Sequence, residues 1–405
     1  MLKTLCLIAF VISFLYNLLL LWLRTRSEHN PIPDTVKDVY DAETYHKWKR
    51  YNAEQNRFGL VRITVVHLVS FLLLLTNAYA AVALPMRENP YVAAILVVVF
   101  YQFIGTLVEL PFDYYLTMRI EEKYGFNRTD AKTFWLDQVK NFLLGLIPIV
   151  GLLCLFVVLH QTLGDWVLLL SGIILFVFIL FISFLSPFFL KIFNKFTPLP
   201  YGELRTKLTA LLEGHGYKVR AIQVMDASKR SSKSNAFFTG FGRMKTIVLY
   251  DTLLESFSDD EICAVFAHEM GHGLHKDTLK MQLLNILTIA ILALFLWLNV
   301  RTDAVSTAFG FDRVNYGFAL VLLFDVEMAF LSPLMDLLRS WFSRRHEYRA
   351  DAQAVSEGYG EPLIAGLKKL NRENLGDLSP SPLLVKLAYS HPTLDQRIRA
   401  IQKAK

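Results

Sequence analysis

The sequence predicts a mainly α-helical protein that crosses a membrane several times. Hydrophobic residues make up 54% of its 405 residues and charged residues only 19%, a balance too apolar for an ordinary soluble protein. The first apolar run is too long for a signal peptide, and no small-residue cleavage site precedes Arg24, so we interpret it as an anchor. Seven runs have the length of about 20 residues that spans a bilayer as a helix: 4–23, 60–84, 91–111, 139–160, 166–190, 280–299 and 314–338.

Lysine and arginine predict the orientation of these spans. Segments 24–59, 112–138, 191–279 and 339–405 carry 7, 4, 12 and 12 of them, whereas the N-terminus and the alternate loops carry four in all. Because basic segments stay on the cytoplasmic side, we expect an N-out, C-in topology that places the last two segments on the same side. This topology also accounts for the net charge of +6, and no nucleic-acid motif accompanies the basic residues, so we expect no nucleic-acid partner.

The third cytoplasmic segment, 191–279, has the pattern of a small α+β unit. Residues 202–214 have a helical pattern, and β-branched and apolar residues predict short strands at 219–225 and 245–250. Ser258 to Glu261 forms a capping box, which predicts a helix from 259 through His272. The chain is therefore expected to have four parts, which alternate between membrane helices and cytoplasmic segments: 1–193, 194–279, 280–338 and 339–405.

The pentapeptide His268-Glu269-Met270-Gly271-His272 has the spacing of a zinc-peptidase site. On a helix, His268 and His272 are one turn apart and face the same way, so both imidazoles can reach a zinc ion about 2.0–2.1 Å away. Glu269 lies beside them, placed to hold the attacking water rather than the metal. The alternative is two ordinary surface histidines on an amphipathic helix. We predict one catalytic Zn²⁺ ion in a small α+β zinc-peptidase domain of the gluzincin type.

A catalytic zinc ion needs a third protein ligand, and the best candidates follow the last apolar run. Glu347 and Asp351 are one helical turn apart, so one carboxylate can bind metal while the other orients a ligand histidine. His346 is the rival ligand, and a charged helix beside the membrane is the alternative for the whole stretch. We interpret His275 as a helix-end or surface histidine, because a fourth protein ligand would close the site to water.

These residues, in this order, resemble the type I CAAX prenyl endopeptidases, a family of integral-membrane zinc metalloproteases. Residues 120–127, with the sequence IEEKYGFN, are similar to a cytoplasmic motif of that family. The resemblance continues through 226–240 and 247–254, which lead into the HExxH helix, and through Ser390-His391-Pro392 with Arg397 near the C-terminus. It covers most of the chain and is weaker over the first 60 residues.

The resemblance implies a bundle of seven transmembrane helices around a large water-filled chamber, with the zinc site at its cytoplasmic end. By position, Glu347 is then the third zinc ligand and Asp351 the outer carboxylate. The partners would be membrane lipids and a peptide or protein substrate, with or without a prenyl group. The expected location is the endoplasmic reticulum membrane of a eukaryote or the inner membrane of a prokaryote, with the active site facing the cytoplasm.

The resemblance also implies which residues handle the substrate. Asn235 and Ala236 would lie on an edge strand that pairs with the substrate backbone, a contact that depends little on side chains. His391 and Arg397 would bind the developing oxyanion and the substrate, as N–H donors opposite the metal can. A helix break at His391 and a solvated Arg397 are the alternatives from the sequence alone.

Two features depart from the family pattern. Thr393 stands where a second proline is usual, a change that leaves the preceding histidine in place. The chain also lacks the insertions of longer eukaryotic members and has no evident retention signal at its end, which favours a prokaryotic member. Two substrate assignments follow within peptide hydrolysis: removal of the C-terminal tripeptide from a prenylated cysteine, or clearance of damaged or stalled membrane proteins.

A transporter or receptor without peptidase activity is the competing class. Ionisable residues within apolar runs are costly and usually functional, and four occur here: His67, Glu109, Asp325 and Glu327. They can equally line a chamber, and a transporter has no reason to place HExxH and a later ExxxD on one cytoplasmic side. The three cysteines have no metal-ligand spacing and are expected to be reduced, buried and structural: Cys6, Cys154 and Cys263.

Overall fold

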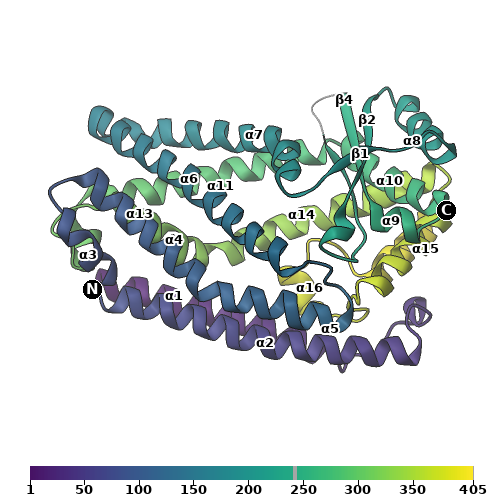
Figure 1. Cartoon of the computed structure of the whole chain (residues 1–405), viewed down its shortest axis with the longest axis horizontal. Helices are drawn as coiled ribbons and strands as arrows, with labels where there is room; N and C mark the ends of the chain where they lie inside the picture. The colour runs from purple at the N-terminus through teal and green to yellow at the C-terminus, as the bar shows by residue number, and fades with distance from the viewer. Residues whose placement is uncertain (240–243, 405) are drawn as a thin grey trace.

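The chain forms an elongated helical bundle with a small α/β unit at one end (Figure 1). The computed structural model describes residues 1–239 and 244–404. Its long helices are α1 (Leu2–Ser27), α2 (Ala42–Leu75), α4 (Pro90–Tyr115), α6 (Ala131–Leu163), α7 (Val167–Phe193), α11 (Asp277–Arg301) and α14 (Ala329–Ser356). Shorter helices between them are α3 (Ala78–Ala83), α5 (Glu122–Tyr124), α12 (Ala304–Ala308) and α13 (Tyr316–Leu322).

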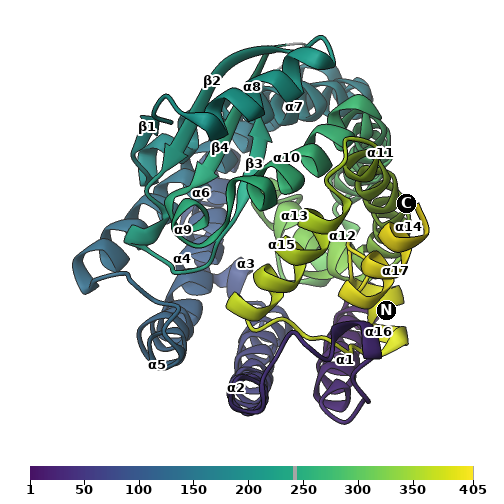
Figure 2. The ribbon, with the colours of Figure 1, turned by 90° about the vertical axis from the view of Figure 1, so that its right-hand side faces the viewer.

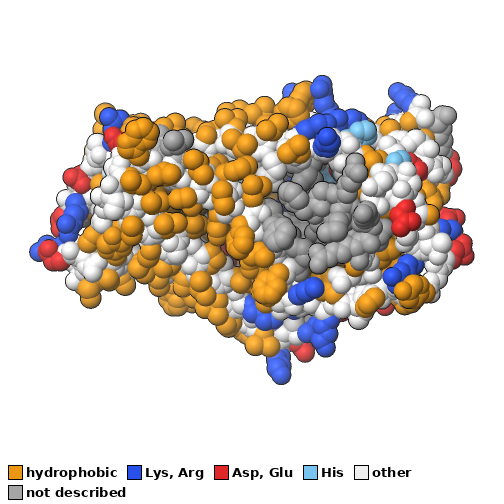
Figure 3. Space-filling model, turned by 90° about the horizontal axis from the view of Figure 1, so that it is seen from above, with side chains coloured by type: hydrophobic (Ala, Val, Ile, Leu, Met, Phe, Trp, Pro, Cys, Tyr) orange, Lys and Arg blue, Asp and Glu red, His pale blue; other side chains and the backbone are white. Residues whose placement is uncertain are grey.

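The bundle has the dimensions of a multi-pass membrane protein. Six helices within the described residues are long and apolar enough to cross a bilayer, and a shorter apolar stretch, Leu170–Phe181, lies within α7. With α7, the helices agree with the seven spans expected from the sequence. Hydrophobic side chains cover the middle of the bundle, while charged side chains gather toward its two ends (Figure 3).

The second span ends earlier than the hydrophobic run predicted. The run 60–84 suggested one helix, but α2 ends at Leu75, and Asn77 adopts the left-handed conformation with φ 59° before α3 begins. Asparagine tolerates this conformation better than most residues. The Lys3 ammonium donates to the Leu75 carbonyl and to Asn77 Oδ1, both at 2.7 Å, and so satisfies groups at the end of the helix. The boundary thus combines the left-handed conformation of Asn77 with a tertiary contact from α1.

The last span continues well beyond its apolar run. The sequence predicted a span at 314–338 and placed the boundary between two parts of the chain at 338. Instead, α13, a π-helical turn at Leu323–Met328 and α14 form one helical rod from Tyr316 to Ser356. Glu347 thus lies on the same rod as the last membrane span, so the membrane bundle itself positions this residue.

A four-stranded sheet forms the β part of the α/β unit. Its order is β1 (Phe196–Pro198), β2 (Lys218–Met225), β4 (Met244–Tyr250) and β3 (Ala236–Thr239). Strands β2 and β4 are parallel, whereas β1 and β3 pair with them antiparallel as the two edges. The expected strands at 219–225 and 245–250 are confirmed as β2 and β4. Edge strand β3 begins at Ala236, one residue after Asn235.

Helix α10 (Asp259–Leu274) packs against this sheet through one apolar face. Ile262, Phe266 and Met270 recur every four residues and are fully buried with the strand residues Ile247 and Leu249. Two further helices complete the unit: α8 (Glu203–Gly214) and α9 (Asp251–Ser256). Helix α10 lies beside strand β3 (Figure 2). Because His268 and His272 lie on the opposite face of α10 from these apolar residues, the packing directs them away from the sheet.

The C-terminal segment closes the unit from the other side. It contains α15 (Gly360–Glu373), α16 (Pro382–Ala388) and α17 (Leu394–Ala404). Leu363 and Leu367 of α15 and Ile398 and Ile401 of α17 share a core with Ala264 of α10. The three cysteines are free, as expected, but only Cys263 is fully buried, whereas Cys6 and Cys154 are partly exposed.

Candidate metal centre

The HExxH helix begins where the sequence predicted. Ser258 Oγ accepts a hydrogen bond from the Glu261 backbone N–H, and Glu261 Oε2 accepts one from the Ser258 N–H, which completes the capping box. The predicted helix from 259 through His272 is confirmed as α10. Acidic residues in its first turn also suit the positive end of the helix dipole.

Glycine at 271 lets α10 approach α14 closely. A Cβ at this position would lie 2.9 Å from Ala350 Cα and 3.0 Å from Gln353 Cβ, which is too close for carbon atoms. Ala350 and Ala354 on the facing side of α14 are also small and fully buried. Small residues on both helices therefore bring the two histidines of α10 against Glu347.

His268, His272 and Glu347 form a compact group of possible metal ligands. Each offers one ligand atom, and these atoms all lie within 4.8 Å of one another. The Nε2 atoms of His268 and His272 are 3.5 and 3.4 Å from the Glu347 carboxylate oxygens. Glu347 is only 4% exposed, and its Oε2 has no hydrogen-bond donor among the described residues. A buried carboxylate oxygen without a donor, beside two imidazoles, fits a divalent cation.

Each of the two histidines has an outer carboxylate beside its Nδ1 atom. Asp351 Oδ1 lies 2.9 Å from His268 Nδ1, and Asp277 Oδ2 lies 3.1 Å from His272 Nδ1. Each contact favours the tautomer in which Nδ1 carries the proton and Nε2 is free for a metal ion. The sequence predicted Asp351, one helical turn after Glu347, but it did not predict Asp277.

Asp277 reaches His272 because the chain turns sharply between two helices. Lys276 has φ 54°, which ends α10 and starts α11 in a new direction. Asp277 is thereby buried, and Arg349 donates to its Oδ1 at 2.6 Å. The only signal in the sequence is a carboxylate five residues after the second histidine, at a spacing that does not share a helix face.

His346 and His275 do not join the ligand group among the described residues. His346 is buried, and its Nε2 lies 3.6 Å from Asp277 Oδ1, behind the outer carboxylate. His275 is the C-cap of α10 and partly exposed. These positions favour Glu347 over His346 and agree with the expectation that His275 is a helix-end residue.

The carboxylates give the site a strongly negative character. Burial lowers the pKa of His272, but Glu347 and Asp277 outweigh burial and raise the pKa of this histidine to about 9. The same carboxylates would stabilise a divalent cation at the Nε2 side of the two histidines.

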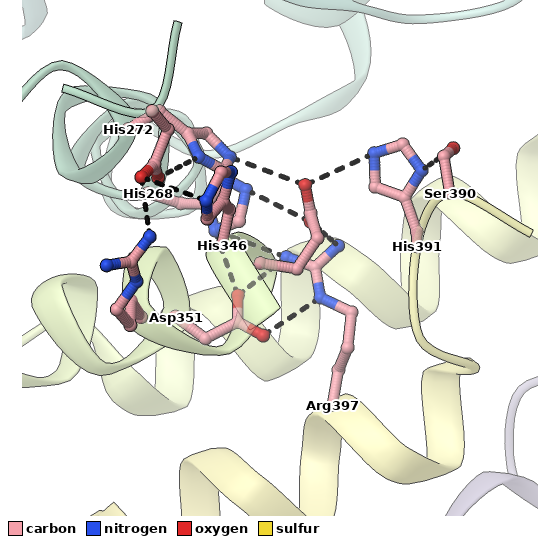
Figure 4. A network of polar contacts seen from close by, with 10 residues as sticks. His268, His272, His346, Asp351, Ser390, His391 and Arg397 are labelled. Carbon is pink, nitrogen blue, oxygen red and sulfur yellow. Dashed lines mark hydrogen bonds and ion pairs between the residues drawn. The ribbon is translucent and has the colours of Figure 1, made fainter. Parts of the chain in front are cut away.

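His391 and Arg397 reach the ligand group from the C-terminal segment: His391 lies on the side away from His268 and His272, and Arg397 extends from α17 toward Asp351 (Figure 4). His391 Nε2 is 3.4 Å from Glu347 Oε1, and the Ser390 hydroxyl is 2.8 Å from His391 Nδ1. The His391 side chain is 61% exposed, so a substrate can reach it. The structure therefore places His391 at the open edge of the ligand group.

Arg397 points inward and binds a carboxylate of the site. Its guanidinium donates to both oxygens of Asp351, at 2.6 and 3.0 Å, and its Nη1 is 3.5 Å from Glu347 Oε2. Its Nη2 is also 3.3 Å from His268 Nδ1, but that nitrogen is itself a donor to Asp351. In this arrangement Arg397 orients Asp351 rather than projecting into open space. Glu269 is half-buried beside the group and interacts electrostatically with His272 and Arg397.

The IEEKYGFN stretch supports the segment that leads to the edge strand. The Ser232 N–H donates to the Phe126 carbonyl at 3.0 Å, and Asn127 forms an isolated β-bridge with Ser231. Glu121 pairs with the Lys233 ammonium at 3.1 Å. These contacts fix the chain just before Asn235 and Ala236.

Ala236 begins the edge strand near the HExxH helix, and Asn235 directly precedes it. The Tyr250 N–H donates to the Asn235 carbonyl, and Ala236 pairs with Leu249 of β4. Asn235 is exposed, whereas Ala236 is buried. Strand β3 is an edge strand that pairs with β4, and α10 lies beside it (Figure 2).

Two of the four ionisable residues of the apolar runs, Glu109 and Asp325, face a cavity of the bundle. A cavity of about 370 Å³ between α2, α4 and α6 is lined by Glu109, Asp325 and other residues. Glu109 pairs with Arg62 at 2.7 Å, and Tyr101 donates to Asp325 at 2.6 Å. Partnered charges around an internal cavity agree with a chamber lining rather than a surface exposed to lipid.

Comparison with known proteins shows the family. Residues 5–195 match the model of the CAAX prenyl protease N-terminal region with five membrane helices, and residues 198–405 match peptidase family M48. The chain belongs to peptidase family M48. It is therefore a metallopeptidase of the integral-membrane CAAX prenyl protease group.

Individual relatives match along nearly the whole chain. The chain is 33% identical to "CAAX prenyl protease 1" of Saccharomyces cerevisiae, over 91% of this chain and 88% of that protein. It is 27% identical to the Homo sapiens homologue, over 92% and 89%. The crystal structure of Saccharomyces mikatae Ste24p superposes with a TM-score of 0.92 at 28% identity and covers 99% of both chains. A prokaryotic source for this chain stays a prediction, since these relatives are eukaryotic.

Proposed function

We propose that this M48 peptidase is a zinc-dependent endopeptidase that removes C-terminal residues from prenylated proteins. The main observation behind this proposal is the group of His268, His272 and Glu347, which lies at one end of a bundle of membrane helices. The names of the relatives, CAAX prenyl proteases, support this substrate class. Clearance of damaged membrane proteins is the second substrate assignment within the same chemistry.

The proposed ligands are His268, His272 and Glu347, with Asp351 and Asp277 orienting the two histidines. Bound there, Zn²⁺ would polarise the scissile carbonyl and lower the pKa of a water molecule. Buried carboxylates on both histidines keep Nε2 available as the donor atom and increase its basicity.

Glu269 serves as the proton carrier in this proposal. It follows His268 directly on α10, so its carboxylate reaches the space beside the ligands without being one of them. Glu269 takes the proton of the attacking water and passes it to the leaving amine. His391, exposed at the edge of the ligand group, donates to the carbonyl oxygen as negative charge develops on it.

The edge strand β3 positions the substrate. An extended peptide beside Asn235 and Ala236 would add a strand between the sheet and α10, which directs its scissile bond toward the ligand group. Arg397 fixes the orientation of Asp351 through two hydrogen bonds, and its role as a donor to the substrate or the oxyanion stays a prediction.

We further propose that the catalytic end faces the cytoplasm. The segments 191–279 and 339–405 hold 24 of the 42 lysine and arginine residues, as expected for cytoplasmic parts. Depending on the source, the membrane would be that of the endoplasmic reticulum or the prokaryotic inner membrane. Labelling of single cysteines from each side tests this orientation, and opposite accessibility of the two segments would contradict it.

The substrate proposal is tested with the purified, zinc-loaded chain and two peptides. One peptide ends in a prenylated CAAX sequence, and the control has the same sequence without the prenyl group. We expect release of the C-terminal tripeptide from the prenylated peptide, detected by mass, and no release by Glu269→Gln with its metal retained. Equal cleavage of both peptides would favour the clearance of damaged proteins, and cleavage of neither by a metal-loaded chain would contradict the CAAX assignment.

A further inference from the structure

Two neighbouring helices expose apolar stripes that end in the same pair of residue types. On α1, exposed residues recur every three or four positions and end at Trp22 and Arg26. On α14, the corresponding stripe ends at Trp341 and Arg345. This spacing keeps each stripe on one helix face that meets lipid. The exposed apolar residues are Leu5, Ile8, Ile12, Leu15 and Leu19 on α1, and Phe330, Leu334 and Leu338 on α14.

Each arginine is stacked on the tryptophan one turn before it. The Arg26 guanidinium carbon lies 4.8 Å from the Trp22 ring centroid, and that of Arg345 lies 3.8 Å from the Trp341 ring. Tryptophan in such a position marks the level of the lipid headgroups. Stacking restrains the flexible guanidinium but leaves its N–H groups free to bind an oxyanion.

These cations have no carboxylate partner among the described residues. Arg26 and Arg345 are both exposed and take part in no ion pair there. The preceding acidic residue on α14, Asp336, lies near Arg339, at 4.0 Å. The pairs therefore present uncompensated positive charge where the apolar surface ends.

Further exposed cations lie on these helices and on α16, which packs against both. Helices α1, α14 and α16 pack together at the catalytic end (Figure 2), where Arg24 and Lys386 are exposed. Arg344 differs, because it donates to the carbonyls of Val385 and Tyr389 and so ties α14 to the end of α16. We name the set Arg24, Arg26, Arg345 and Lys386, with Trp22 and Trp341, the α1/α14 patch.

We propose that the α1/α14 patch binds the headgroup phosphate of an anionic phospholipid. The acyl chains would lie along the two apolar stripes, the tryptophans would sit at the headgroup level, and the guanidinium groups would bind the phosphate oxygens. Arg345 is two residues from Glu347 on α14, so a bound lipid would hold the helix that carries a candidate metal ligand. None of the patch residues lines the cavity between α2, α4 and α6, and the proposal does not depend on the proposed substrate.

A similar pair at the opposite end of the bundle provides a matched control. Arg301 stacks on Trp297 at 4.7 Å, again four residues apart, at the end of α11. There, however, the Trp297 indole N–H donates to Asp165 at 2.9 Å, so a carboxylate stands beside the pair. Negative charge at this end disfavours an anionic lipid, although the stacking is the same.

The experiment is lipid titration of the purified, delipidated full-length chain, followed by native mass spectrometry. The probes are phosphatidylglycerol, phosphatidylcholine and inorganic phosphate. We expect the chain to prefer phosphatidylglycerol over phosphatidylcholine. Each cation at an anionic surface contributes about a fivefold preference, so Arg26→Gln with Arg345→Gln should weaken phosphatidylglycerol binding by about 25-fold, whereas Arg301→Gln should leave it unchanged.

Three results would overturn the proposal. The first is equal binding of the two lipids by the unmodified chain, which needs no variant and so does not depend on folding of the double variant. The second is loss of phosphatidylglycerol binding in Arg301→Gln as large as in the double variant. The third is full competition by millimolar inorganic phosphate, which would indicate a free-anion site instead of a lipid site. Metal content and melting temperature of each variant report its folding.

Discussion

Gly271→Ala should separate the two helices that build the metal centre. Its Cβ would meet Ala350 Cα at 2.9 Å, whereas carbon atoms pack at about 3.5–4.0 Å, so α10 and α14 must move apart by roughly 0.6–1 Å. Ala350 Cα is backbone and cannot turn aside as the end of a flexible side chain would. Glu347 on α14 would then move away from His268 and His272, and metal sites tolerate only about 0.2 Å in ligand distance.

The size of the effect follows from the cost of overpacking. Extra methyl groups in a well-packed core cost about 1–3 kcal/mol. If the metal-bound state has to close the helices again, this energy opposes binding. At about 1.4 kcal/mol for each factor of ten, the Kd for zinc should rise about 10-fold to 100-fold. Turnover at limiting zinc should fall in the same proportion.

The assay is competition between the purified chain and a chromophoric zinc chelator. Gly366→Ala is the matched control, because a Cβ at Gly366 of α15 meets Glu261 and Val265 of α10 at 3.8 Å, an ordinary contact. This control variant should bind zinc normally and gain up to about 1 kcal/mol of helix stability. Unchanged zinc affinity in Gly271→Ala would refute the idea that close helix packing sets the ligand geometry.

The remaining predictions concern individual side chains of the site. Glu347→Ala should reduce zinc affinity by about 100-fold or more, beyond the effect of losing an outer partner; if His346→Ala releases the metal instead, the ligand assignment is wrong. Asp277→Asn keeps the shape of the side chain but removes the negative charge beside His272, so zinc affinity or turnover should fall about 10-fold to 100-fold. If equilibrium dialysis finds the zinc affinity of the parent chain and the kinetics are normal, Asp277 does not orient His272 for the metal. His391→Ala should lower turnover by about 100-fold to 1000-fold while zinc stays bound, and near-normal steady-state rates would leave the oxyanion donor unassigned.

The sequence alone predicted the parts of this protein that depend on local pattern. Apolar runs of membrane length predicted the spans, since hydrocarbon requires every backbone group to be satisfied within a helix. The capping box predicted the start of α10 at 259, and alternation predicted β2 and β4. The HExxH spacing placed His268 and His272 on one face because residues four apart on a helix share a side.

Other features depended on contacts between distant parts of the chain. The end of α2 includes a contact from Lys3, and Asp277 reaches His272 only because Lys276 turns the chain there. No local sequence pattern predicts these contacts, because helix packing brings the contacting residues together.

The identity of the third metal ligand, Glu347 or His346, also depended partly on local pattern and partly on tertiary packing. The sequence brought both residues to one helix near the end of the last span, and only the resemblance to a known family favoured Glu347. In the folded chain, the close approach of α10 at Gly271 directs Glu347 toward the histidines and leaves His346 behind Asp277. Helical periodicity determines which residues can share a face, but the helix that packs against that face determines which of them meets the metal.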